Sequence, residues 1–149
     1  MTNRPKQIGT ATETALVRYF RARGWPRADR LALRGSGDIG DIGLDPRLCI
    51  EVKGGKAAET ASDTQVTWWL VEAQREAEAK GAALPILIMK RKGVGAANCG
   101  RWWAVMTSEN YDALRLADEE PVQNGMAAIR FTVDHLIETL IAAGYREED

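Results

Sequence analysis

The sequence predicts an α/β fold in which a mixed central β-sheet is flanked by helices. Stretches with apolar residues at helical spacing alternate with short apolar runs typical of strands. The order is a helix, a β-hairpin, a long helix, further strands and a last helix, which favours a layered arrangement. With 149 residues, 45% of them hydrophobic, the chain is expected to form one domain with a substantial core.

Four segments are expected to be helices. They are residues 9–24, 62–80, 108–116 and 133–143. In the first, Thr10 and Glu13 fit a capping box, in which each side chain bonds a free backbone N–H of the first turn. Ser62 and Gln65 form a second capping box at the start of the long helix, and Ser108 is the expected cap of the third. Glycines close three of these segments, as expected of helix ends.

Strands are expected at six places. They are residues 30–34, 41–44, 48–53, 85–89, 102–106 and 127–132. The run at 102–106 is the expected antiparallel partner of 85–90. Gly54 and Gly55 end the third of these strands. In the long helix, Trp68 and Trp69 are adjacent, so at least one must face the core. Core packing is expected for both, and the alternative for the second is stacking on bases or burial at a dimer interface.

The pair of runs at 41–44 and 48–53 reads as a tight β-hairpin. The turn residues are Asp45-Pro46-Arg47, with Pro in a favoured turn position. This loop makes Leu44 the partner of Leu48, and counting back makes Asp41 the partner of Glu51. Opposed residues in an antiparallel pair have Cβ atoms roughly 4.5–5.5 Å apart. The hairpin therefore brings two carboxylates together.

Strand alternation gives this hairpin a core face and a polar face. The core face is expected to carry Ile42, Leu44, Leu48, Ile50 and Val52. The polar face carries Asp41, Cys49, Glu51 and Lys53. Two opposed carboxylates repel, so a cation between them is expected, and Mg²⁺ is held by such oxygen ligands. The alternative is an ordinary amphipathic hairpin whose polar face is exposed to solvent and on which Glu51 forms an ion pair with Lys53.

Charge is unevenly distributed along a chain whose net charge is only −1. Residues 1–56 hold 11 Lys or Arg against 6 Asp or Glu, whereas residues 57–149 hold 9 against 15. The first part includes a cluster of arginines: Arg18, Arg21, Arg23, Arg27, Arg30 and Arg34. Such a cluster can neutralise nucleic-acid phosphates, although a solvated helix face with no partner is the alternative.

Composition excludes several other classes of protein. The two cysteines, Cys49 and Cys99, lie 50 residues apart and form no metal-spaced cluster, so reduced thiols are expected. The single histidine, His135, disfavours histidine-based catalysis and His-rich metal sites. No apolar run approaches the roughly 20 residues of a membrane span, and the first residues lack a signal-peptide core. A cytoplasmic protein of a bacterium or a phage-infected cell is expected, with neither a membrane partner nor a small organic cofactor.

The order of these motifs resembles the PD-(D/E)xK nuclease superfamily. The motifs are Glu13 in the first helix, the segment 35–42 with its Gly and Asp residues, Glu51-Val52-Lys53, and the helix with Gln65 and Gln74. Within the superfamily, the chain looks most like archaeal-type and phage-encoded Holliday junction resolvases. The resemblance covers about residues 9–90 and adds little after about 107.

The resemblance implies a restriction-endonuclease-like core at about residues 9–107, with a helix and strand extension at 108–149. It implies that Asp41, Glu51 and the Val52 carbonyl bind Mg²⁺, for which Mn²⁺ could substitute, and that Lys53 is the catalytic lysine. Glu13 would be a helix carboxylate that reaches the ion, but its capping-box role needs no catalysis.

Further residues are candidates around this site. Asp38 is the rival of Asp41 as the metal ligand, although strand parity turns it away from Glu51 unless a bulge intervenes. Candidate DNA contacts are Arg27, Arg30, Arg34, Ser36 and Gly37. Gln65 and Gln74 are accessory candidates, each alternatively a plain helix-surface amide.

The function expected from the resemblance is a Mg²⁺-dependent DNA endonuclease that resolves four-way junctions in recombination and repair. Family resolvases act as homodimers, and Trp102, Trp103 and the strand at 85–89 are a candidate dimer interface. One alternative is a restriction-like or repair nuclease on duplex, flap or single-stranded DNA. Another is a DNA-binding module on the same fold that has lost catalysis, and an RNA-processing nuclease is a third.

Overall fold

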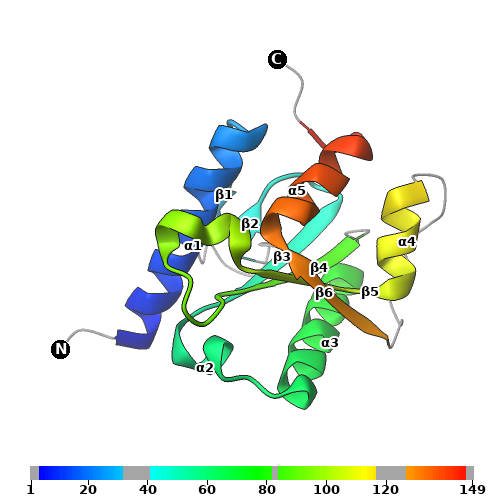
Figure 1. Ribbon diagram of the computed structural model, residues 1–149. Helices are drawn as coiled ribbons and strands as arrows, with labels where there is room; N and C mark the ends of the chain where they lie inside the picture. Colours follow the sequence, from blue (N-terminus) through cyan, green and yellow to red (C-terminus); the bar gives the residue numbers. More distant parts are fainter. Residues whose placement is uncertain (1–3, 32–40, 82–83, 117–126, 147–149) are drawn as a thin grey trace.

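The computed structural model describes residues 4–31, 41–81, 84–116 and 127–146, with side chains from residue 10 onward. Within these residues, six strands form one sheet in the order β1-β2-β3-β4-β5-β6. The neighbours β3 and β4 are parallel, and every other neighbouring pair is antiparallel. The predicted α/β class with a mixed, helix-flanked sheet is therefore confirmed (Figure 1).

The strands are β1 (Asp29–Arg30), β2 (Ile42–Gly43), β3 (Leu48–Lys53), β4 (Leu84–Met89), β5 (Trp103–Thr107) and β6 (Ala128–Thr132). The helices are α1 (Arg4–Arg23), α2 (Gly55–Glu59), α3 (Asp63–Lys80), α4 (Ser108–Leu116) and α5 (Val133–Ala142). A 3₁₀ segment, η1 (Ala96–Arg101), precedes β5. The run at 30–34, expected to be a strand, is extended at Arg30, and residues 32–34 lie outside the described part.

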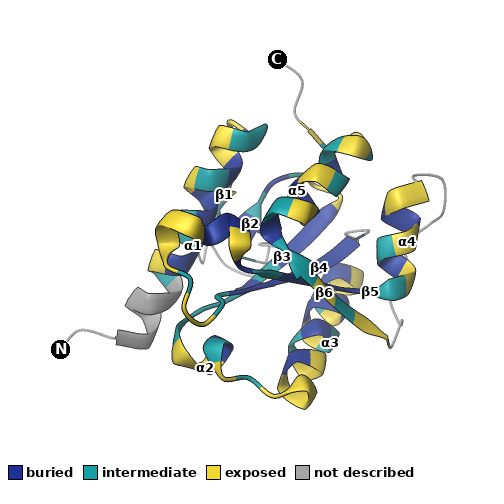
Figure 2. Ribbon diagram, viewed as in Figure 1, coloured by how far each residue is buried: buried dark blue, intermediate teal, exposed yellow. Residues whose placement is uncertain are grey.

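Helices cover both faces of the sheet (Figure 1). One face packs against α1, η1 and α5, and the other packs against α2 and α3. Figure 2 shows the central strands buried and the outward surfaces of the helices exposed. Because β4 is covered on both sides, all its six residues are buried, which explains its unbroken apolar sequence.

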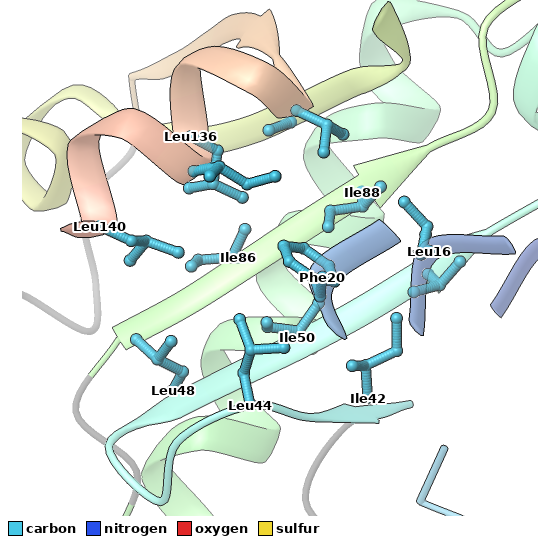
Figure 3. Close-up of a cluster of buried hydrophobic side chains, with 14 of the residues drawn as sticks. Leu16, Phe20, Ile42, Leu44, Leu48, Ile50, Ile86, Ile88, Leu136 and Leu140 are labelled. Atoms are coloured by element: carbon cyan, nitrogen blue, oxygen red, sulfur yellow. The ribbon is translucent and has the colours of Figure 1, made fainter. Parts of the chain in front are cut away.

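The main core lies between the sheet and the α1–α5 layer. In Figure 3, Leu16 and Phe20 of α1 lie over Ile50 of β3, and Leu136 and Leu140 of α5 lie over β4. The five residues predicted for the core face of the hairpin are all buried in this cluster. The alternation of side chains along β3 was therefore predicted correctly, and it sends Cys49, Glu51 and Lys53 toward α3.

The hairpin register is the predicted one, but the first strand is shorter. Ile42 pairs with Ile50, which is the pairing that a three-residue loop requires. Asp41 forms a bend before β2 instead of the first residue of a strand. Its backbone N–H donates to the Ile50 carbonyl at 2.7 Å, so the regular ladder ends there.

Two of the predicted helix starts are wrong. The first helix begins at Arg4, so Thr10 and Glu13 lie in its interior and form no capping box. Before α4, the cap is Thr107, whose hydroxyl accepts from the Asn110 N–H at 3.1 Å, and Ser108 is already helical. The Ser62 cap is confirmed, since its hydroxyl accepts from the Gln65 N–H at 3.1 Å.

Gly54 allows a close approach between α1 and the end of β3. A Cβ atom at this position would lie 2.2 Å from Thr12 Oγ1, which no side chain could tolerate without movement. The contact brings the α1 residue next to Thr12, namely Glu13, toward the end of β3. Gly55, with φ of 70°, then starts the short helix α2, which the sequence analysis missed.

Burial contradicts two expectations about the tryptophans. Trp102 and the strand β4 are buried within the chain itself, so they are not free for the expected dimer interface, whereas its third member, Trp103, is only partly buried. Trp68 is 56% exposed and does not pack in the core, whereas Trp69 is partly buried against the second apolar cluster. Among the described helices, none combines the length and apolarity needed to cross a bilayer.

Candidate active site

Asp41 is fixed by three hydrogen bonds, two with β3 and one with Leu31, which follows β1. Its carbonyl accepts from the Leu31 N–H at 3.0 Å, and its N–H donates to the Ile50 carbonyl at 2.7 Å. Its carboxylate Oδ2 accepts from the Val52 N–H at 2.8 Å, taking the place of a ladder bond. The side chain of Asp41 is thereby held next to Glu51 at the edge where β2 begins.

Glu51 extends from the middle of β3 toward α3 and is partly buried. Burial, a hydrogen bond with Glu76 and the negative charge of Asp41 raise the pKa of Glu51 to about 10. At neutral pH this carboxyl therefore holds a proton when no cation is present. The predicted crowding of Asp41 and Glu51 occurs, and a third carboxylate adds to it.

Glu76 of α3 is the site residue that the sequence analysis missed. One oxygen of Glu76, one of Glu51 and the Cys49 sulfur lie within 4.8 Å of one another. Glu76 follows Ala73 by three residues and precedes Ala77, both fully buried, and such small residues let the helix approach the sheet closely. An acidic residue flanked by small buried positions was the only sequence signal for it.

Cys49 is an unsuitable ligand for a hard cation. It is fully buried against Ala77, and burial with the charge of Glu76 raises the pKa of its thiol to about 12. Metals bind the thiolate, so binding through sulfur would require an unfavourable deprotonation. The oxygen atoms of Asp41, Glu51 and Glu76 suit a hard divalent cation such as Mg²⁺ better.

Glu13 of α1 lies within electrostatic range of Asp41 but has a partner of its own. Its Oε2 accepts from Arg30 Nε at 2.9 Å, and the Arg30 guanidinium also donates to Thr10 Oγ1 at 3.3 Å. Burial raises the pKa of Glu13, the Arg30 hydrogen bond lowers it, and the charge of Asp41 raises it further. Thr10, expected as a cap, thus helps to position Arg30.

Lys53 lies at the end of β3 on the same sheet face as Glu51. Its Nζ is 3.9 Å from Glu72 Oε2 of α3 and 5.6 Å from the centre of the Trp69 ring. The Lys53 side chain is 32% exposed, so its amine can reach solvent or a bound anion. Its ion-pair partner is Glu72, whereas the simple amphipathic hairpin would pair it with Glu51.

Much of the arginine cluster near α1 is neutralised within the chain. The guanidinium of Arg21 lies 3.6 Å from the Asp29 carboxylate, that of Arg23 lies 3.2 Å from Asp134, and Arg30 pairs with Glu13. Arg18 and Arg27 are exposed, as is Arg21. The basic surface expected in this half of the chain is therefore weaker than the count of arginines indicates.

The remaining candidates are dispersed or undescribed. The residues Arg34, Ser36, Gly37 and Asp38 lie outside the described part of the chain, so the structure does not compare Asp38 with Asp41. Gln65 is exposed in the first turn of α3. Gln74 is buried among the apolar residues of the same helix, so it is no plain surface amide. The Val52 amide binds Asp41, while the Val52 side chain is in the core.

Comparison of the chain with protein-family models, with curated proteins and with solved structures gives no match. The geometry of the site is therefore the basis for a functional proposal.

Proposed function

We propose that this protein is a metal-dependent endodeoxyribonuclease of the PD-(D/E)xK type with a restriction-endonuclease-like core, and that it cleaves four-way DNA junctions. The observation that carries the proposal is the convergence of Asp41 and Glu51 at one sheet edge, with Lys53 following on the same face. Helix α1 precedes this hairpin and α3 follows it, which agrees with the motif order of that superfamily.

The donor set fits a divalent cation held by oxygen. Asp41 Oδ2 is used by the Val52 N–H, which leaves its other oxygen and the oxygens of Glu51 as ligands. Glu76 is a further carboxylate within reach of Glu51. When bound, Mg²⁺ would lower the pKa of a coordinated water and stabilise negative charge on the phosphoryl group.

The chain's own groups supply positioning and charge. Asp41 and Glu51 would orient the attacking water opposite the leaving oxygen of the phosphodiester. Lys53 would lie beside the phosphate and neutralise the extra charge of the transition state, giving up its weak pairing with Glu72. Glu51 must lose its proton for this arrangement to form, since its pKa is raised by burial and the neighbouring carboxylates.

The proposal that the substrate is branched DNA rests on the family resemblance. The proposal of a homodimer, in which two copies would cut two strands symmetrically, rests on it as well. The first test is cleavage of a labelled four-way junction beside a linear duplex of the same arm sequence, with Mg²⁺ or with EDTA. Symmetric nicks in the junction alone, lost with EDTA, are expected. Cutting of both substrates would exclude specificity for the junction, and cutting of neither would exclude nuclease activity.

Three variants connect the activity to the site. Asp41→Asn, Glu51→Gln and Lys53→Ala should each abolish most cleavage while the chain remains folded. Glu78→Gln, on an exposed turn of α3, is the matched control and should cleave normally. Wild-type cleavage in any of the first three variants would mean that the site has been misassigned.

A further inference from the structure

A second basic feature lies at the far end of the sheet from the arginines of α1. A hollow of about 210 Å³ opens where α2 meets the ends of β4, β5 and β6. Its described lining includes the cations Lys90, Arg91, Lys92 and Arg130, with Glu59 as the one acidic residue among them. The hollow is thus strongly basic, although it belongs to the acidic half of the sequence.

Trp103 holds two of these cations in place. The guanidinium carbon of Arg91 lies 4.1 Å from the centre of the Trp103 ring, and that of Arg130 lies 5.4 Å from it. Arg91 also donates to the Arg101 carbonyl at 3.3 Å. Stacking on one ring keeps two like charges close together and lowers the entropy lost when they bind an anion.

Most of these cations lack acidic partners of their own. Lys90 Nζ lies 3.7 Å from Glu59 Oε1, which satisfies one cation of the hollow. Within the described residues, no carboxylate forms an ion pair with Arg91, Lys92 or Arg130. The arginines near α1 differ in this respect, because three of them have such partners. An anion bound in the hollow would therefore meet uncompensated positive charge.

The hollow lies next to the proposed catalytic lysine. Lys53 pairs in register with Met89, and Met89 pairs with Trp103, so all three point to the α3 face. The Lys90 N–H donates to the Lys53 carbonyl at 2.9 Å. Two strand spacings separate Lys53 from Trp103, which is about 10 Å. Because the phosphates of one DNA strand lie further apart than the axial rise of about 3.4 Å per nucleotide, this distance corresponds to no more than a few nucleotides.

We infer that this hollow binds a backbone phosphate of the DNA strand that is cut at the Asp41–Glu51 site, a few nucleotides from the scissile bond. The inference rests on the proposed function. A guanidinium group can bond two phosphate oxygens at once, and Arg91 and Arg130 provide two such groups at one place. The strand would run from Lys53 across the end of β4 to Trp103.

The test measures binding separately from cleavage. A fluorescently labelled four-way junction is titrated with Arg91→Ala/Arg130→Ala, with Lys92→Glu and with wild type in EDTA, at several salt concentrations. Arg115→Ala is the matched control, because the Arg115 guanidinium carbon lies 5.7 Å from the Tyr111 ring centre on α4, away from the hollow. Thermal melts verify folding, and Lys92→Glu, at an exposed position, decides the question if the double variant is unstable.

The double variant is expected to bind at least about tenfold more weakly, and its slope of log affinity against log salt should fall by about 1, as expected for one lost phosphate contact. Lys92→Glu should also bind more weakly, and Arg115→Ala should match wild type. Wild-type affinity and slope in the folded double variant and in Lys92→Glu would overturn the subsite.

The two proposals fail in different ways. If wild type cuts the junction and the variants bind it normally, the nuclease stands and the phosphate subsite does not. If wild type binds through the hollow but never cuts with Mg²⁺, the subsite stands as a DNA contact and the nuclease does not. Absence of any DNA binding by wild type would overturn both.

Discussion

Replacing Glu51 by Gln should stabilise the metal-free protein at neutral pH. The pKa of Glu51 is about 10 in the folded chain, against an ordinary value of 4.5 that applies when the chain is unfolded. Between these values the unfolded state binds fewer protons than the folded state, so the free energy of unfolding falls as pH rises. Gln has nearly the same shape and no proton to hold, so it removes this dependence.

The size of the effect follows from the pH interval. Each pKa unit corresponds to about 1.36 kcal/mol, and pH 7 lies about 2.5 units above the ordinary value, which gives up to about 3 kcal/mol at pH 7. The gain should be near zero close to the ordinary pKa and should grow steadily toward pH 8. A stabilising change at a buried polar position is unusual, since most substitutions destabilise.

The assay is urea unfolding followed by tryptophan fluorescence at pH 5, 6, 7 and 8 in EDTA. Glu78→Gln, on the same helix as Glu76, is the control, and it should stay within about 0.5 kcal/mol of wild type at every pH. Added Mg²⁺ should raise the stability of wild type but not of Glu51→Gln, because a ligand stabilises the state that binds it. If the free energy of unfolding changed with pH in the same way for wild type and Glu51→Gln, the raised pKa of Glu51 would be refuted.

Other expected results test the surrounding structure. Asp41→Ala should cost about 1–3 kcal/mol of unfolding free energy in urea titrations because it strands the Val52 N–H, whereas Asp41→Asn should cost less; equal losses would contradict the bond. Gly54→Ala should cost about 1–3 kcal/mol through its clash with Thr12, and Thr12→Ala in the same chain should restore part of it; strictly additive losses would exclude the contact. Trp68→Ser should change the free energy of unfolding by less than about 0.5 kcal/mol, and a large loss would place Trp68 in a buried contact.

Local patterns predicted the hairpin and its faces. The three-residue turn fixes which residues are opposed, and strand alternation then assigns every side chain of β3 to one face. The pairing of Ile42 with Ile50 and the burial of the apolar set follow from these two rules. The helix α3 was predicted equally well, because Ser62 and Gly81 mark its ends in the sequence.

Long-range contacts were not predictable in this way. Glu76 meets Glu51 only because α3 packs across the sheet, and nothing in the spacing between the two residues indicates this. The basic hollow likewise joins the lysines and arginine that follow β4 to Arg130 of β6, two segments that are distant in the sequence. The net charge of that half of the chain is negative, so it gives no indication that four basic side chains gather at one place.

The start of α1 was misjudged for a local reason. Thr10 and Glu13 have the spacing of a capping box, but the same spacing also places two side chains on one face inside a longer helix. There they are neighbours of Arg30 instead of partners of free backbone N–H groups. The pattern therefore identified two residues that act together, but their role is to bind Arg30 and not to cap the helix.

The ion pair between Arg30 and Glu13 couples the charge of the helix carboxylate to whatever binds Arg30. While Arg30 holds Glu13, the helix carboxylate is compensated internally and has little attraction for a second cation. If the protein acts as proposed, a DNA phosphate at this edge would compete with Glu13 for Arg30, and the released Glu13 would add its negative charge to that of Asp41. Substrate and metal would thus bind cooperatively, each strengthening the affinity for the other by the same factor. Under the proposed function, the metal affinity of the free protein would therefore be low and would rise when DNA is bound.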